Sequence, residues 1–167
     1  MKRYVGRSQK DAISLARQAQ LDLIGDALDA SDDGFAIWKS VRAPDNSIEN
    51  FTVLLMNKTG ADAAEIPQTE VVGKTLKEIA PGEGATGLHA LFTKALLLGR
   101  SVKEVVPGRS MEGLPVAYEN TVVPFGKDLV FATYRDVTEV EKEHDRLLWL
   151  SEHDFLTGMP NLSLIHI

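Results

Sequence analysis

Hydrophobic residues near the start of the chain recur at the spacing of one helical face. Leu21, Ile24 and Leu28 lie three and four positions apart within a stretch rich in Ala, Leu and Gln, which is typical of an amphipathic helix. A cluster of turn-forming residues follows at 31–34. The pattern therefore predicts a leader helix over residues 9–30.

Short continuous runs of β-branched and aromatic residues predict five strands after this helix. They cover residues 35–38, 51–56, 101–106, 116–123 and 129–134. Turn-forming residues at 43–47 predict a hairpin between the first two strands, and those at 125–128 predict a turn between the fourth and fifth strands. Pro107-Gly108 predicts the turn between the third and fourth strands.

Helical patterns occupy the remaining segments. Residues 57–98 are helical in character but interrupted by Pro and Gly, which predicts several short helices. The longest covers 88–98 and ends at Gly99, in the position of a helix C-cap. A heavily charged helix is predicted over 138–153.

This order of elements, together with four short segments, resembles the PAS family over about residues 28–140. The segments are Ala30–Trp38, Leu55–Asp62, Val72–Leu76 and Arg135–Glu139. In the second of them, an Asn at the end of a strand begins the first short helix. The resemblance implies an α+β fold, namely a five-stranded antiparallel sheet with short helices on one face, flanked by N-terminal and C-terminal signalling helices.

The last segment resembles the Asp-(Ile/Val)-Thr-Glu tag that closes PAS domains. Its residues here are Asp136, Val137, Thr138 and Glu139. The Asp and Thr side chains can accept hydrogen bonds from the free N–H groups that begin a helix. A rigid junction of this kind would let a distortion of the sheet turn or shift the helix, so we expect signal transmission here in addition to helix capping.

A sharper motif follows the last predicted helix and resembles the Asp-x-Leu-Thr-Gly-Leu-Pro-Asn segment with which GGDEF (diguanylate cyclase) domains begin. The matching residues are Asp154, Leu156, Thr157, Gly158, Pro160 and Asn161. Met159 replaces the family's Leu, which is a mild change. The Gly-Gly-(Asp/Glu)-(Asp/Glu)-Phe segment that would hold metal and GTP does not occur in the sequence, so we expect no cyclase activity, catalytic residue or metal ligand in this chain.

The residues after Asn161 depart from the GGDEF pattern. Leu162 stands where the family usually has Arg, and residues 163–167 match nothing expected of the first GGDEF helix. Leu-Ser-Leu-Ile-His-Ile is one reading frame of CTG TCT CTT ATA CAC ATC, a transposon-end adapter used in sequencing libraries. We therefore expect residues 162–167 not to be native and the gene to continue into a full GGDEF domain.

Composition narrows the class of protein. A net charge of −6 and a pI near 5.2 argue against a nucleic-acid-binding surface. No apolar stretch approaches the roughly 18–20 residues that span a bilayer, and the basic N-terminus lacks the apolar segment of a signal peptide, so we expect a cytoplasmic chain without a transmembrane segment. The absence of Cys excludes the cysteinyl-flavin chemistry of light-sensing PAS relatives and any thiolate metal site.

The space between the sheet and the short helices could hold a cofactor, and the sequence leaves two kinds open: haem or a small organic molecule. The candidate pocket residues are Trp38, Leu55, Phe92, Leu96 and Tyr118, which are equally typical of a plain core. His89 lies in the region from which haem-binding PAS domains supply an axial ligand. The alternative for His89 is an ordinary surface or half-buried helix residue.

The last helix carries a weak heptad seam. Its positions are Val137, Val140, His144, Leu147, Ser151 and Asp154. Because few of them are apolar, two registers of a coiled coil can lie close in energy, which suits a switch. We expect a homodimer through this helix, aided by the leader helix; the alternative is a solvated connector with Leu147, Leu148 and Leu150 packed on the domain.

These features divide the chain into a leader (1–30), a sensory domain (31–137), an output helix (138–153) and the start of a GGDEF domain (154–167). The resemblance implies a sensory and dimerisation module of a cyclic di-GMP signalling protein, in which two GGDEF domains must meet. A stand-alone PAS module for ligand binding or protein interaction is the alternative. A histidine kinase fragment is disfavoured because Gly158 and Pro160 would break its long helix.

Overall fold

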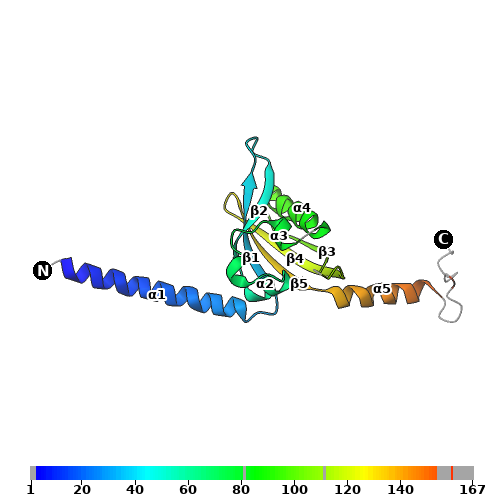
Figure 1. The fold of residues 1–167 in the computed structure, drawn as a ribbon, viewed down its shortest axis with the longest axis horizontal. Coiled ribbons are helices and arrows are strands. Elements are labelled where there is room, and N and C mark those ends of the chain that lie inside the picture. Colours follow the sequence, from blue (N-terminus) through cyan, green and yellow to red (C-terminus); the bar gives the residue numbers. More distant parts are fainter. Residues whose placement is uncertain (1–2, 81, 111, 154–158, 160–167) are drawn as a thin grey trace.

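The structure is a computed structural model that describes residues 3–80, 82–110, 112–153 and 159. Two long helices project from a central domain, α1 (Arg3–Asp29) before it and α5 (Thr138–Glu152) after it (Figure 1). The strands are β1 (Gly34–Arg42), β2 (Ile48–Met56), β3 (Val102–Arg109), β4 (Pro115–Phe125) and β5 (Leu129–Asp136). Between β2 and β3 lie α2 (Lys58–Ala63), the 3-10 turn η1 (Gln68–Glu70), α3 (Leu76–Ile79) and α4 (Glu83–Leu98).

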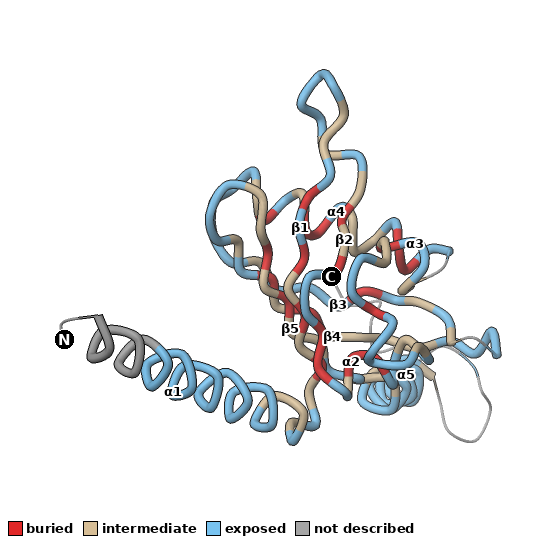
Figure 2. The backbone as a smooth tube through the Cα atoms, turned by 60° about the vertical axis from the view of Figure 1, so that its left-hand side comes forward, coloured by how far each residue is buried: buried red, intermediate tan, exposed pale blue. Residues whose placement is uncertain are grey.

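The five strands form one antiparallel sheet in the order β2-β1-β5-β4-β3. Along β1, alternate residues from Gly34 to Ser40 are buried and those between them are less so, which is the period of a strand with one covered face. The short helices lie on the covered face (Figure 2). The α+β fold expected from the sequence is confirmed.

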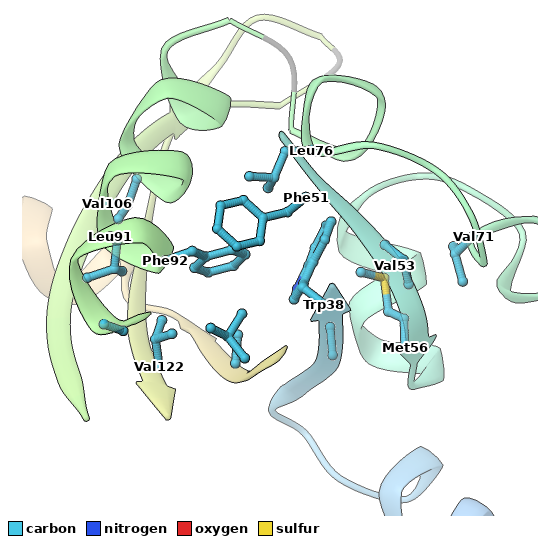
Figure 3. Packing of buried hydrophobic residues seen from close by; sticks show 14 of the residues in the cluster. Trp38, Phe51, Val53, Met56, Val71, Leu76, Leu91, Phe92, Val106 and Val122 are labelled. Atoms are coloured by element: carbon cyan, nitrogen blue, oxygen red, sulfur yellow. The ribbon is translucent and has the colours of Figure 1, made fainter. Parts of the chain in front are cut away.

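Three aromatic side chains form the centre of the core. The ring of Phe92, on α4, lies 5.5 Å from that of Trp38 on β1 and 5.2 Å from that of Phe51 on β2, measured between centroids (Figure 3). All three side chains are at most 2% exposed. Such tilted and edge-on contacts are the favoured geometry for aromatic pairs, so Phe92 fixes α4 against the sheet.

The turn predicted at Pro107-Gly108 is wrong. Both residues lie inside β3, where they pair with Ala117 and Val116 of β4, and the chain reverses only after Arg109. A proline is tolerated there because β3 is at the edge of the sheet, where a missing N–H need not interrupt the ladder of hydrogen bonds.

Two helices are longer than their sequence patterns predict. α1 begins at Arg3 rather than at residue 9, and α4 begins at Glu83 rather than at residue 88. The predicted end of α4 is confirmed, because Gly99 has a φ of 62° and its N–H donates to the carbonyl of Ala95. That left-handed conformation favours glycine.

Candidate functional site

A cavity of about 320 Å³ lies between the covered face of the sheet and the short helices. Parts of all five strands and of α2, α3 and α4 form its walls. The lining includes Trp38, Met56, Leu88, Phe92, Asn120 and Tyr134. The volume is at the lower end of the roughly 300–1,000 Å³ found for small-molecule sites.

Two polar atoms in the cavity wall lack a hydrogen-bond partner among the described residues. They are the indole Nε1 of Trp38 and the hydroxyl oxygen of Tyr134, both shielded from solvent. Burial above all, and then the neighbouring Tyr118, raises the pKa of Tyr134, so this hydroxyl keeps its proton at neutral pH. A buried donor without an acceptor costs about 1–3 kcal/mol. Each of these two atoms has less than 1 Å² of accessible surface, so both are enclosed by the protein.

Sequence reasoning placed five side chains in such a pocket, and three of them line it. Those three are Trp38, Phe92 and Tyr118. Leu55 does not, because a β-bulge after Ile37 leaves it paired with that residue and 39% exposed. Leu96 lies at the margin of the core instead.

Tyr134 and Asn120 are cavity residues that sequence reasoning missed. The alternation Val130, Ala132, Tyr134 puts all three on the covered face of β5, with the first two buried. The same alternation puts Asn120, which is 2% exposed, beside Tyr134 on β4. Strict period-two counting along these strands could have found both residues.

His89 lies apart from the cavity wall. Its ring packs edge-on against Phe51, with 5.6 Å between centroids, and its buried Nε2 has no partner in the described part of the chain. The described residues that line the cavity include no histidine. The structure therefore does not fit the hypothesis that His89 is an axial ligand to haem in this cavity.

Asn57 joins the leader helix to the domain through four hydrogen bonds. Its side-chain oxygen accepts from the N–H groups of Phe35 (2.8 Å) and Gly60 (3.0 Å). Its amide nitrogen donates to the carbonyls of Leu28 (2.7 Å) and Asp33 (3.0 Å). The expected role of Asn57 at the start of a helix is confirmed, and the same side chain, 2% exposed, also holds the end of α1 against β1.

Asp33 and Arg135 connect the two ends of the sensory domain. Arg135, at the end of β5, donates two hydrogen bonds of 2.8 Å to the Asp33 carboxylate, just before β1. The guanidinium holds the pKa of Asp33 below its ordinary value. This bidentate pair, a geometrically specific kind of ion pair, puts the base of α1 next to the base of α5.

Replacing Asp33 by Asn is expected to lower the free energy of unfolding by about 0.5–1 kcal/mol at pH 7, because the pair is largely solvent-exposed. A carboxyl with a lowered folded-state pKa stabilises the fold above its ordinary pKa of about 3.9 and stops doing so as the pH falls through the folded value. Urea unfolding at pH 7 and near pH 3 should therefore show the difference shrinking in acid. Asp32→Asn, at an exposed neighbour, is the control; a difference that grows in acid would contradict the assignment.

The Asp136–Glu139 tag anchors α5 to the sheet. The Asp136 carboxylate accepts from the Thr138 N–H (2.9 Å) and hydroxyl (2.6 Å), so Asp136 binds a free N–H at the start of α5 as expected. The Thr138 side chain does not cap the helix as expected, because its hydroxyl is bonded to Asp136 and to the sheet. In addition, the Thr138 hydroxyl oxygen accepts from the Ala117 N–H of β4 at 3.0 Å, and the Val137 N–H donates to the Ala117 carbonyl at 2.9 Å. The first turn of α5 is thus bonded to β4 near the start of that strand.

Beyond that turn, α5 has no buried residue. Its exposed apolar side chains are Val140, Leu147, Leu148, Trp149 and Leu150. The alternative in which Leu147, Leu148 and Leu150 pack on the domain is therefore wrong for this structure. All the residues of the GGDEF-like motif lie outside the described residues, namely Asp154, Leu156, Thr157, Gly158, Pro160 and Asn161. Asp154 is also the last position of the predicted heptad seam.

The cavity beneath a five-stranded antiparallel sheet and the helix-capping tag define a sensory domain of the PAS class. The chain belongs to the PAS fold family, whose sequence profile matches residues 49–142. No curated protein matches the chain.

Solved structures with a similar fold include light-oxygen-voltage proteins. An RNA-binding light-oxygen-voltage receptor has a TM-score of 0.60 and 17% identity, and the match covers 78% of this chain but only 36% of the receptor. The Rhodobacter sphaeroides LOV protein has a TM-score of 0.54 and 16% identity over 78% of this chain and 73% of that one. A PAS domain from Colwellia psychrerythraea has a TM-score of 0.54 and 13% identity over 71% and 98%. These likenesses concern the fold.

Among the described residues, no three acidic or histidine side chains gather as a metal site would require. No helix in the same residues is both long and apolar enough to cross a bilayer.

Proposed function

We propose that this chain is the sensory module of a cyclic di-GMP signalling protein. In it, residues 31–137 sense a stimulus, residues 138–153 carry the response, and a GGDEF diguanylate cyclase domain begins at residue 154. The observation that carries the proposal is the motif from Asp154 to Asn161, which follows the output helix directly in the sequence. By resemblance, that motif opens a cyclase domain.

The attachment of α5 supports a mechanical route for the signal. Two hydrogen bonds to Ala117 and the cap from Asp136 tie the first turn of α5 to β4 and β5. A change in the tilt of these strands would therefore turn the helix, while the exposed remainder of α5 is free to adopt another register. Small shifts become discrete switches when a helix has two packings of similar energy.

Exposed apolar side chains on both long helices support a homodimer. Ile13, Leu21 and Ile24 of α1 are all more than half exposed, as are Val140 and Leu147 of α5. Paired helices would bury these side chains in a coiled coil and hold two cyclase domains at a high effective concentration.

Cyclic di-GMP synthesis by the parent protein tests this proposal. The gene is first sequenced beyond the codon for Asn161, and the encoded protein is then assayed for conversion of GTP to cyclic di-GMP. Inserting one heptad between α5 and Asp154 should preserve much of the activity, because it restores the helical phase. Inserting two residues should reduce the activity at least tenfold, because it rotates one end of the coil by about 200° against the other.

Two results would contradict the proposal. One is a native stop codon after Ile167, which would leave a stand-alone PAS module. The other is a continuing reading frame without a Gly-Gly-(Asp/Glu)-(Asp/Glu)-Phe segment. Equal activity after both insertions would reject only the coiled-coil route of transmission.

A further inference from the structure

The face of the sheet opposite the short helices carries a row of apolar side chains across four strands. Cross-strand pairing places Leu55 of β2 beside Ile37 of β1, and Ile37 beside Phe131 of β5. Phe131 in turn lies beside Val123 of β4, and its ring stacks on that of Phe35 with 5.8 Å between centroids. Leu55 and Val123, at the two ends, are 39% and 40% exposed. These four paired residues form the open-face row, which stays partly exposed to solvent in the described structure.

The helix α1 carries apolar side chains that a coiled coil would leave uncovered. Leu15 and Leu23 are 73% and 70% exposed, and they lie about 80° apart around the helix axis with Ala19 between them. Ile24, one of the side chains that a coiled coil of two α1 helices would bury, lies about 180° from Leu15. All residues from 11 to 27 are exposed. Leu15, Ala19 and Leu23 therefore form a second apolar stripe, the α1 stripe.

The α1 stripe and the open-face row have matching lengths. From Leu15 to Leu23 the helix rises about 12 Å, at about 1.5 Å per residue. Four neighbouring strands, spaced about 4.8 Å apart, span about 14 Å. A helix laid across the strands would therefore contact the whole row with its two leucines and Ala19, and both apolar surfaces would leave water.

The charges beside the two surfaces are opposite. Asp22 and Asp26 lie within about 20° of Leu15 around the axis of α1. On the sheet, Lys39 lies on the same face of β1 as the row, and it makes no ion pair with any described residue. Glu119, on that face of β4, is already paired with a lysine of β3 at 2.9 Å. A second sheet face would bring further lysine to this surface, whereas α1 brings carboxylates.

The α1 helix of the same chain is held away from the open-face row. The amide of Asn57 donates to the carbonyl of Leu28 at 2.7 Å, and the N–H of Lys58 donates to the carboxylate of Asp29 at 2.7 Å. These bonds fix the last turn of α1 at the start of α2, and the helix projects from the domain (Figure 1). A helix on the row must therefore come from another molecule.

We propose that α1 of a second copy of this chain docks on the open-face row, with the α1 stripe against the row and the aspartates of α1 toward Lys39. Each copy of a homodimer then gives its helix to the sheet of the other. The inference rests on the homodimer of the proposed function and names the surface that α1 contacts in it, while the seam of α5 remains free to pair. It does not depend on the cyclase domain.

Cross-linking between single-cysteine variants tests the docking, since the chain has no native Cys. Ala19→Cys in the α1 stripe is mixed with Val123→Cys in the row, and a short bismaleimide is added; a mass tag on one variant identifies the mixed product. We expect this product to form about tenfold faster than that of Ala19→Cys with Leu97→Cys, because docking gives the two thiols a high effective concentration. Leu97 is on α4, which covers the other face, and is 78% exposed, so random collision would favour the control.

Charge reversal tests the orientation of the docked helix. Lys39→Glu should raise the dissociation constant of the dimer about 3- to 10-fold in sedimentation equilibrium, because it sets a carboxylate against the aspartates of α1. Adding Asp22→Lys and Asp26→Lys to this variant should restore dimerisation, because opposite charges then face each other again. Lys77→Glu, at an exposed position on α3, is the control and should leave the dissociation constant unchanged.

Three results would overturn the inference. Faster linking of Val123→Cys to itself than to Ala19→Cys would show that two sheet faces pack together. Equal rates with Val123→Cys and Leu97→Cys would show collision alone, and a chain that stays monomeric would remove the second copy altogether. None of these results bears on the cyclase proposal, which is decided by the gene beyond Asn161 and by cyclic di-GMP synthesis. Loss of the cyclase proposal would likewise leave the docking result intact.

Discussion

Asn57→Ala is expected to lower the free energy of unfolding by about 3–5 kcal/mol, because it removes four hydrogen bonds at once. The backbone N–H groups of Phe35 and Gly60 and the carbonyl of Asp33 lose the bond to Asn57. The Leu28 carbonyl also loses one bond but keeps the Ser31 N–H as a donor at 3.3 Å. Asn57 is 2% exposed, so water cannot easily replace it. Urea unfolding followed by circular dichroism measures the loss.

Asn50→Ala is the matched control for this prediction. Asn50 lies on β2, and its side-chain oxygen accepts one local hydrogen bond, from the Phe51 N–H at 2.8 Å. Its removal should cost about 1 kcal/mol or less. Similar losses in the two variants would show that Asn57 does not hold the junction of α1, α2 and β1 together.

The order of elements was predictable because its signals are local. Each strand has its own β-branched or aromatic run, and the end of α4 is marked by Gly99, whose conformation depends on a few neighbouring residues. The capping role of Asn57 could be predicted for the same reason. Its bonds to Leu28 and Asp33 could not, because they depend on where α1 comes to rest.

The errors arose where a residue's environment depends on distant parts of the chain. Pro107 is a turn former by its local sequence, but β3 is an edge strand, in which a proline is tolerated. Leu55 reads as a core residue until a bulge in the pairing of β1 with β2 leaves it exposed. His89 was considered as a ligand, but its orientation toward Phe51 is set by the packing of α4.

The cavity shows the same division between local and long-range information. Trp38, Phe92 and Tyr118 were predictable as large inward-facing residues. Their chemical consequence was not, because an unpaired donor is recognised only when every neighbour is known. The pairing of Gly34 with Tyr134 across β1 and β5 is a related case, since nothing in either residue's local sequence reveals how closely they approach.

Gly34→Ala is expected to cost about 2–3 kcal/mol of unfolding free energy through steric overlap. A Cβ at this position would lie 2.1 Å from Cε2 of Tyr134. The hydroxyl of the same ring lies 2.0 Å from the place where a Cβ on Gly60 would lie, so the ring fills the space beside both glycines. The ring of Tyr134 therefore occupies space that only a glycine leaves free, and Tyr134 also lines the cavity.

A double-mutant cycle with Tyr134→Val separates this steric effect from any intrinsic effect of alanine in a strand. Valine favours a strand as tyrosine does but has no ring. In the Tyr134→Val background, Gly34→Ala should therefore lower the free energy of unfolding by less than about 0.5 kcal/mol, which gives a coupling energy near 2 kcal/mol. Gly25→Ala, in α1 with no atom within 4 Å of the new Cβ, should not destabilise the chain, because alanine favours a helix. If Gly34→Ala costs the same in both backgrounds, the contact with Tyr134 is not the reason for glycine at this position. If the cost disappears as expected, the contact with the ring of Tyr134 is the reason for glycine at position 34.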